Sequence, residues 1–260
     1  MGMEQEERRK YLIGYLADER GQTADVPQDE TEQKRLLRAL FNVRPPRAAS
    51  EEFLRVQDAY LQEELRRKGI TDAHDLTPVS PDTYLWRGDI TTLACDGIVN
   101  AANAQMLGCF APNHLCIDNA IHTFAGVQLR SACAAIMRAQ GHDGPTGRAK
   151  ITKAYNLPSK RVLHTVGPIV YGALTGKHER ALADCYRACL ALADKNGLES
   201  LAFCCISTGE FHFPSARAAR IAVRTVEEYK RETHSGIKVI FNVFKECDYE
   251  IYTRIFKEYR

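Results

Sequence analysis

Two cysteines and one histidine lie close together in the segment from Gly108 to His122. Cys109, His114 and Cys116 form a C-x4-H-x-C pattern. Thiolate and imidazole are ligands that select zinc over magnesium or calcium. A structural zinc site usually has four protein ligands, whereas a catalytic site keeps one position open for water or substrate. Because only three good ligands lie close together, the pattern favours a catalytic zinc site.

The same cluster also has a simpler interpretation. Free cysteine is often a small buried hydrophobic residue, and the chain has nine cysteines, so two of them can fall close together by chance. The sequence that follows favours the metal. Apolar residues recur at helical spacing from Ile117 to Met137, which predicts a helix that begins near Asp118. Its first turn would bring free backbone N–H groups and a carboxylate beside the three candidate ligands.

Composition restricts the class of protein. The chain has 260 residues and is 45% hydrophobic, which is enough for a real core. Its 35 basic and 33 acidic residues leave no basic excess of the kind that nucleic-acid binding needs. No run of eighteen apolar residues occurs, and the N-terminal segment is charged. Together with cysteines that form no disulfide-like pattern, this predicts a cytoplasmic protein without a membrane segment.

The chain divides into two parts by pattern. Residues 1–81 contain three charge-rich, helix-like segments, 4–20, 29–42 and 50–68. The third has Ser50 as an N-cap and Gly69 at its end, and its apolar stripe needs a partner surface. We therefore expect a helical N-terminal extension that packs on the remainder of the chain.

Residues 82–260 alternate between strand and helix patterns. We expect strands at 84–87, 97–101, 150–154, 161–166, 200–206 and 238–244, and helices at 118–140, 178–196, 215–231 and 248–258. This alternation predicts a three-layer α/β/α domain with a mixed, largely parallel sheet. Such sheets bind ligands at the carboxyl ends of their strands.

Three loops with small residues are expected at those strand ends. They are 87–91, 100–103 and 207–211. The Ser-Thr-Gly sequence at the start of the third can surround a phosphate with N–H groups, as can the helix that begins at Asp118. A diphosphate could lie between the two, although each motif alone is more often an ordinary turn.

Taken together and in order, five segments resemble those of a macrodomain, the ADP-ribose-binding fold. These segments are Gly88–Thr91, Ile98–Asn103, Thr146–Thr152, Leu163–Pro168 and Ile206–Gly209, and the resemblance covers residues 82–260. One segment differs, because Cys109–Cys116 replaces the glycine-rich loop that most macrodomains have before Val-Asp-Gly-Ala-Ile-His. This replacement resembles the microbial zinc-dependent macrodomains, in which a helical N-terminal extension is typical.

The resemblance implies a function and partners. It implies hydrolysis of mono-ADP-ribose from modified proteins, with zinc as the cofactor and Asp or Glu as the expected linked residue. Members of that branch accompany a macrodomain-linked sirtuin and a lipoyl-carrier protein. We expect ADP-ribose and mono-ADP-ribosylated proteins as partners, and neither a membrane nor nucleic acid.

The resemblance also implies roles for individual residues. At the adenine end, Asp89 would accept a hydrogen bond from the amino group, Ile90 would line the same end, and Phe244 would stack on the ring or else be a core aromatic residue. Asn103 and Asp118 would fix the distal ribose, although a turn residue and an N-cap are simpler interpretations. The residues that would hold the diphosphate and the distal ribose, mainly through backbone groups, are Ser207, Thr208, Gly209, Glu210 and Phe211.

Asp118 and Asn103 are the predicted catalytic residues, beside a zinc ion held by Cys109, His114 and Cys116. The ion could lower the pKa of a bound water to roughly 7 or position the ribose, and Asp118 would orient the nucleophile or act as general base. We interpret His122 as structural. The alternative function is a non-catalytic ADP-ribose-binding module whose pocket the zinc only shapes. A nucleic-acid module on the same fold is disfavoured by the near-neutral charge.

Overall fold

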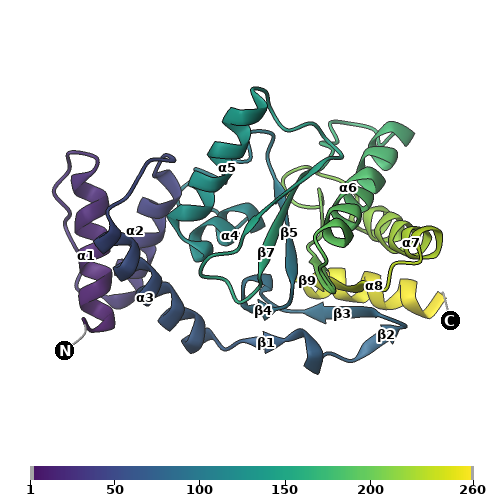
Figure 1. The fold of residues 1–260 in the computed structure, drawn as a ribbon, viewed down its shortest axis with the longest axis horizontal. Helices are drawn as coiled ribbons and strands as arrows, with labels where there is room; N and C mark the ends of the chain where they lie inside the picture. Colours follow the sequence, from purple (N-terminus) through teal and green to yellow (C-terminus); the bar gives the residue numbers. More distant parts are fainter. Residues whose placement is uncertain (1–2, 259–260) are drawn as a thin grey trace.

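A seven-stranded sheet forms the centre of the computed structural model, which describes residues 3–258 (Figure 1). Its strand order is β2-β3-β9-β8-β5-β7-β6, with parallel pairing from β3 through β7 and antiparallel pairing at both edges. The strands are β2 (Pro78–Ser80), β3 (Thr83–Arg87), β5 (Gly97–Ala102), β6 (Ala149–Lys153), β7 (Arg161–Val166), β8 (Ser200–Phe203) and β9 (Lys238–Val243). A separate parallel pair joins β1 (Thr71–Asp72) to β4 (Leu93–Ala94). The predicted mixed, largely parallel sheet is confirmed.

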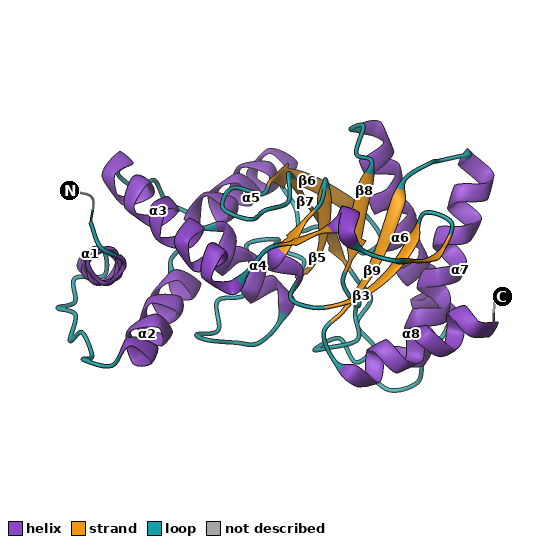
Figure 2. Ribbon diagram, turned by 90° about the horizontal axis from the view of Figure 1, so that it is seen from below, coloured by secondary structure: helices purple, strands orange, loops and turns teal. Residues whose placement is uncertain are grey.

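Helices flank this sheet on both sides (Figure 2). In that view α4 (Ile117–Ala125) and α5 (Val127–Gln140) lie to the left of the sheet, and α6 (Gly176–Lys195), α7 (Ser215–Thr233) and α8 (Glu246–Glu258) lie to the right. α6 packs on α7, and α7 packs on α8. The strand ends that lead into these helices meet at one edge of the sheet, where a ligand site is expected.

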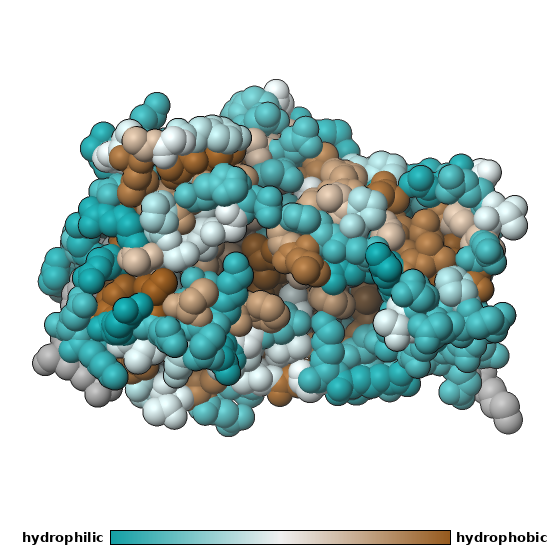
Figure 3. Space-filling view, turned by 180° about the vertical axis from the view of Figure 1, so that it is seen from behind, coloured by the Kyte–Doolittle hydropathy of each residue, from teal (hydrophilic) through white to brown (hydrophobic). Residues whose placement is uncertain are grey.

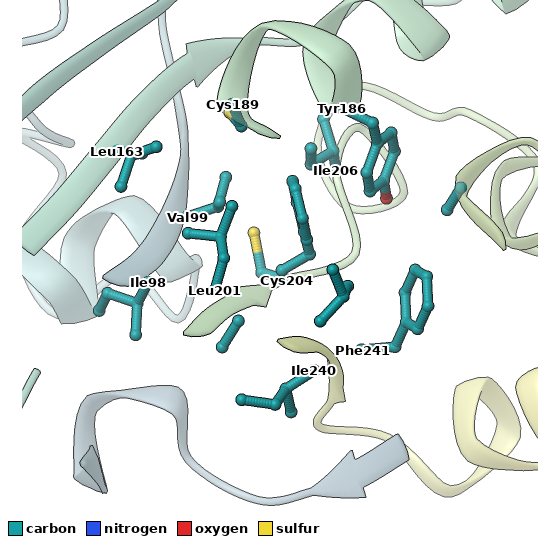
Figure 4. Close-up of a cluster of buried hydrophobic side chains, with 14 of the residues drawn as sticks. Ile98, Val99, Leu163, Tyr186, Cys189, Leu201, Cys204, Ile206, Ile240 and Phe241 are labelled. Atoms are coloured by element: carbon teal, nitrogen blue, oxygen red, sulfur yellow. The ribbon is translucent and has the colours of Figure 1, made fainter. Parts of the chain in front are cut away.

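The inner strands form the hydrophobic core (Figure 4). Figure 4 shows Val99 of β5 and Leu201 of β8 in the same buried cluster as Tyr186 and Cys189, which α6 contributes. All four are buried. Because helices cover both faces, these strands are continuous apolar runs instead of alternating ones. The resulting rigid layer fixes the positions of the loops at its edge.

The segment predicted as one helix over 118–140 forms two helices, so that prediction was wrong in detail. The break is at Gly126, which has φ 94°, a conformation that favours glycine. A Cβ at Gly126 would lie 2.7 Å from Nε2 of Gln57 in α3 (Glu51–Lys68). The side-chain oxygen of Gln57 accepts a hydrogen bond from the Val127 N–H at 2.9 Å. A residue from the extension therefore caps the first turn of α5, which no local pattern reveals.

The N-terminal extension contains the helices α1 (Gln5–Asp18), α2 (Glu30–Val43) and α3, which pack around a small core that also includes Val127 of α5. Ser50 caps α3 by accepting from the Phe53 N–H at 3.1 Å, as the sequence predicts. The sheet begins earlier than the expected boundary at residue 82, because β2 pairs with β3. A proline at its first position suits a short edge strand, since it has no N–H to donate.

Hydrophilic side chains cover most of the face shown in Figure 3, with hydrophobic ones in hollows near its middle. Among residues 3–258, no helix is both long enough and apolar enough to cross a membrane.

Candidate active site

The loop before α4 brings the three predicted metal ligands together. The ligand atoms of Cys109, His114 and Cys116 all lie within 4.8 Å of one another, and each residue is partly buried. Cys109 Sγ is 3.6 Å from His114 Nδ1. In a tetrahedral zinc site with Zn–S and Zn–N bonds of the usual lengths, these two atoms are about 3.6 Å apart. The donor set and its spacing therefore fit zinc.

Two further contacts support this fit. Nε2 of His114 lies 3.6 Å from Oε1 of Glu210, in the loop after β8. A carboxylate beside the free ring nitrogen is the usual partner of a metal-binding histidine. Cys116 is the N-cap of α4, and its Sγ accepts from the Asn119 N–H at 3.4 Å. Burial raises the pKa of the Cys116 thiol to about 12, so a cation is needed to hold it as thiolate at neutral pH.

Asp118 lies in the first turn of α4 and is buried, with 5% of its surface exposed. Asn100, within β5, donates from Nδ2 to Oδ1 of Asp118 at 2.8 Å. Oδ2 has only a long contact, 3.5 Å, with Nδ2 of Asn103. Burial raises the pKa of Asp118 to about 6, although the bond from Asn100 lowers it. One carboxylate oxygen is thus fixed, and the other remains available for substrate.

Asn103 is both a turn residue and a neighbour of Asp118. Its Oδ1 accepts from the Met106 N–H at 3.1 Å, and its Nδ2 donates to the Gly108 carbonyl at 3.1 Å. These bonds fix the chain just before Cys109. The structure therefore brings Asn103, Asp118 and the ligand loop together, and it gives Asn103 a clear role in shaping that loop.

A second group of metal-binding side chains, His122, Cys133 and His164, lies buried near Asp118. His164 Nδ1 is 3.2 Å from Nδ2 of Asn100, which can only donate, and its Nε2 is 3.0 Å from Thr152 Oγ1. Nε2 must then carry the proton, so His164 has no free lone pair for a metal. Burial also lowers the pKa of His164 to about 4 and holds that of His122 well below its usual value. Both rings are neutral, in agreement with a structural role for His122.

The loop after β8 presents unpaired backbone amides. Within residues 3–258, the N–H groups of Gly209, Glu210 and Phe211 find no acceptor in the protein. The loop is held by bonds from the Phe213 N–H to the Ser207 carbonyl at 3.0 Å and from the His212 N–H to the Gly209 carbonyl at 3.0 Å. Successive free amides opposite a helix N-terminus form an anion site. This is the arrangement that a diphosphate needs.

Ser207 and Thr208 support this loop from within. Ser207 is buried and has φ 67°, and a Cβ at Gly167 would lie 2.1 Å from its Oγ. Only glycine allows the loop after β7 to approach so closely. Thr208 Oγ1 donates to the Cys205 carbonyl at 3.1 Å. Their side chains face the protein, so their role toward a ligand is limited to backbone groups.

The expected adenine end lies at the loop after β3. Asp89 Oδ1 accepts from the N–H and the hydroxyl of Thr91, and Oδ2 lies 3.3 Å from Nζ of Lys68. Ile90 is 1% exposed and packs in the core, so it supports this loop instead of presenting its side chain to a ligand. Phe244 follows β9 and is 77% exposed, which excludes the core interpretation and leaves its ring free to stack.

Sequence reasoning missed three contributors to this site. Asn100 occurs in the Asn-Ala-Ala-Asn segment, and a polar residue inside an apolar strand was a signal that it has a buried partner. The carboxylate of Glu210 was assigned only a backbone role, because nothing in the sequence places it beside His114. Lys68 belongs to the extension, and no sequence pattern links it to Asp89.

A mixed sheet with free amides in the loop after β8, a helix N-terminus opposite it and an acidic residue after β3 defines an α/β domain with an anion-binding site at the carboxyl ends of its strands. The family model described as Macro domain matches residues 99–222. This chain belongs to the macrodomain family.

Relatives agree over nearly the whole chain. The chain is 58% identical to a protein-ADP-ribose hydrolase of Treponema medium over 259 residues, covering 97% of this chain and 99% of the relative. It is 50% identical to a protein-ADP-ribose hydrolase of Staphylococcus aureus strain MRSA252 over 254 residues, covering 96% and 95%. Both alignments include the extension, which is therefore shared with these relatives.

Solved structures show the same fold. A Trypanosoma brucei macrodomain in complex with ADP-ribose matches with a TM-score of 0.65 and 31% identity, covering 88% of this chain and 96% of that one. An Oceanobacillus iheyensis macrodomain with ADP matches with a TM-score of 0.63 and 35% identity, covering 71% and 95%.

Proposed function

We propose that this protein is a zinc-dependent hydrolase that releases mono-ADP-ribose from modified proteins. Relatives that are 58% and 50% identical over nearly the whole chain bear the name protein-ADP-ribose hydrolase, which supports the hydrolase activity. The zinc dependence rests on one observation, which is that the ligand atoms of Cys109, His114 and Cys116 lie together beside the N-terminus of α4. The carboxylate of Asp118 lies in the first turn of the same helix.

Two thiolates and one imidazole would hold the ion and leave one position for substrate. When bound, zinc supplies a Lewis acid that polarises a ribose hydroxyl or a water molecule. Because two thiolates reduce that acidity, we give positioning of the ribose equal weight. The amides of residues 209–211 and of Ile117 bind the diphosphate, and Phe244 stacks on the adenine.

Asp118 is the proposed catalytic residue. Asn100 fixes Oδ1 at 2.8 Å, so Oδ2 points to a defined place and can orient a water molecule and accept its proton. Hydrolysis then forms a bond from the water oxygen to C1″ of the ribose and breaks the bond from C1″ to the side-chain oxygen of the modified protein.

An ester-type linkage to Asp or Glu suits these residues. A carboxylate leaves as an anion and needs no strong general acid. The two histidines nearest Asp118, His122 and His164, are buried and neutral, so neither supplies a proton readily. Carriers modified on Asp or Glu should therefore be cleaved faster than carriers modified on Ser or Arg.

Target and compartment follow from the same proposal. A lipoyl-carrier protein, which the family resemblance suggests, is one substrate to assay beside a generic modified carrier. Since a metal can bind Cys109 and Cys116 only while both thiols are reduced, we place the activity in a reducing compartment such as the cytoplasm.

Release of ADP-ribose from a mono-ADP-ribosylated carrier tests the function. We expect chelation to reduce turnover and added zinc to restore it. Cys109→Ser should have the effect of chelation, whereas Cys247→Ser, which changes an exposed cysteine outside the site, should retain full activity. Turnover that is unaffected by chelation would reject the zinc dependence. Binding of ADP-ribose without turnover would favour the non-catalytic binding module.

A further inference from the structure

The loop that carries the candidate zinc ligands is held from outside the macrodomain. α2 of the N-terminal extension lies beside α4 in both ribbon views (Figures 1 and 2). Its residues contact the main chain of the loop at points between the ligands. These contacts give the extension a structural role at the candidate metal site.

Arg38 of α2 makes the most direct contact. Its Nη2 donates to the backbone carbonyl of His114 at 3.0 Å. Its Nη2 and Nε also donate to Oδ1 of Asn119, at 2.8 Å and 3.2 Å. Asn119 in turn donates from Nδ2 to the Ala111 carbonyl at 3.1 Å. One guanidinium thus fixes the histidine ligand directly and the middle of the loop through Asn119.

Asn42, one helical turn further along α2, holds the neighbouring residue. Its Oδ1 accepts from the backbone N–H of Asn113 at 2.9 Å, and its Nδ2 donates to Thr123 Oγ1 of α4 at 2.9 Å. Asn113 has φ 57°, a left-handed conformation that is uncommon for residues other than glycine. A buried side chain that satisfies its amide stabilises this conformation, which turns His114 toward Cys109.

The end of α2 is anchored as well. Arg130 of α5 is buried and donates to the carbonyls of Phe41 and Asn42 at 3.2 Å and 2.8 Å, and also to that of Arg44. Its guanidinium lies 4.2 Å from the ring centroid of Phe110, the residue after Cys109. A cation at a helix C-terminus is favourable, and here it also packs against the ligand loop.

From these contacts we propose that α2 is part of the metal site, and that Arg38 and Asn42 are positioning residues for zinc binding. They touch neither the ion nor the substrate. They hold the main chain of residues 113–114 so that the ligand atoms of Cys109, His114 and Cys116 stay together without the ion. The inference rests on the proposed zinc site and extends it to the extension.

The test measures zinc affinity alone, by competition of the full-length protein with a chromogenic chelator. Partners that orient a metal ligand typically contribute 10–100-fold to metal affinity, so we expect Arg38→Met to weaken zinc binding by about tenfold or more. Arg35→Met is the matched control, because Arg35 is exposed on the same helix and, among residues 3–258, pairs only with Glu32. It should change the affinity by less than about twofold.

Two further variants distinguish the hydrogen-bonding role of α2 from the charge of Arg38 and from loss of folding. Arg38→Lys keeps the charge but lacks the planar fork, so it should remain at least about threefold weaker than the unchanged protein. Full recovery by lysine would mean that charge alone acts, and would overturn the inference. Asn42→Ala keeps every charge and breaks the bond to Asn113, so it should also weaken zinc binding. It tests the inference even if Arg38→Met does not fold.

The outcomes distinguish this inference from the function it rests on. If the unchanged protein binds no zinc, the proposed metal dependence fails, and this inference fails with it. If the unchanged protein binds zinc and Arg38→Met and Asn42→Ala bind it equally well, only the role of α2 is rejected. At saturating zinc, calorimetric affinity for free ADP-ribose should be retained in each variant, because residues 209–211 lie outside these contacts.

Discussion

Glu210 is one residue that contributes to two parts of the site, one through its backbone and the other through its side chain. Its backbone belongs to the loop with free amides, while its carboxylate lies 3.6 Å from Nε2 of His114. We expect Glu210→Gln to weaken zinc binding by about tenfold, because an amide orients and polarises an imidazole less well than a carboxylate does. Affinity for free ADP-ribose should hold, since the backbone is unchanged.

Chelator competition and calorimetry measure these two affinities for the Glu210 variant. Glu250→Gln, an exposed change on α8, is the control. Equal loss of zinc and ADP-ribose affinity would show that the carboxylate acts on the nucleotide and not on the histidine.

Asp118 separates turnover from binding. Removing the whole side chain would leave one of the two N–H groups of Asn100 Nδ2 without an acceptor in the interior, which costs about 1–3 kcal/mol, so the better variant is Asp118→Asn. Its side-chain oxygen can still accept from Asn100. Turnover should fall by at least ~100-fold, the lower end of what a general base contributes, while the affinity for ADP-ribose changes little.

A single-turnover assay and a titration with ADP-ribose compare Asp118→Asn with Asp143→Asn, an exposed control. Loss of affinity in parallel with turnover would make Asp118 a ligand anchor, and retained turnover would remove it from the chemistry.

The buried carboxylate also predicts a pH dependence of stability. In the zinc-free protein the pKa of Asp118 is raised to about 6, above its unfolded value, because burial disfavours the charged form. Its contribution to stability is therefore fully present below pH ~4 and is lost as the pH rises through ~6. Relative to the unchanged protein, Asp118→Asn should gain about 2–3 kcal/mol of unfolding free energy between pH 4 and pH 7.

Urea unfolding of the metal-free proteins at several pH values measures this difference. A difference that does not depend on pH would show that Asp118 titrates alike in the folded and unfolded states.

At the scale of elements, local sequence patterns predicted most of the helices, strands and caps that depend on neighbouring residues alone. The Ser50 cap, the alternation after residue 82 and the apolar inner strands are all readable within short windows. The break at Gly126 is not, because its cause is a side chain of α3 that is distant in sequence. The same holds for the loop with the candidate zinc ligands. Its residue types are visible in the sequence, but the contacts from α2 that shape it come from residues far away in the chain. The bond between Asn113 and Asn42, for example, joins residues that are 71 positions apart.

Gly126 gives a test at this scale. Gly126→Ala places a Cβ 2.7 Å from Gln57 and also strains the backbone at φ 94°, so it should destabilise the protein by about 2–4 kcal/mol. Gly141→Ala is the matched control, with φ 78° at the end of α5 and nothing within 4 Å of the added Cβ. It should cost only about 1–2 kcal/mol of backbone strain. Similar losses in urea unfolding would show that the close approach of Gln57 is unimportant.

Over the whole molecule, the extension and the sheet domain are joined by partly buried polar contacts in addition to apolar ones. Asp58 of α3 accepts from Gln128 of α5 at 2.9 Å and from Asn156 at 2.7 Å. If the two parts separate, Asp58 loses both of these donors at once. This loss opposes separation, so neither part is expected to unfold before the other. The macrodomain and its extension should behave as one cooperative unit.

Arg130 is the residue on which this cooperativity can be tested. Trp86 in β3 is the single tryptophan and reports on the sheet domain, whereas far-ultraviolet circular dichroism reports on all helices. The two probes should give coincident urea transitions in the unchanged protein. Arg130→Met leaves the carbonyls at the end of α2 unpaired, so the dichroism transition should begin at lower urea than the fluorescence transition. Arg138→Met, an exposed change on the same helix, should keep them coincident. Coincident transitions in Arg130→Met would mean that the bonds of Arg130 are not needed to couple the parts, and the metal loop would then depend on α2 only through the local bonds of Arg38 and Asn42.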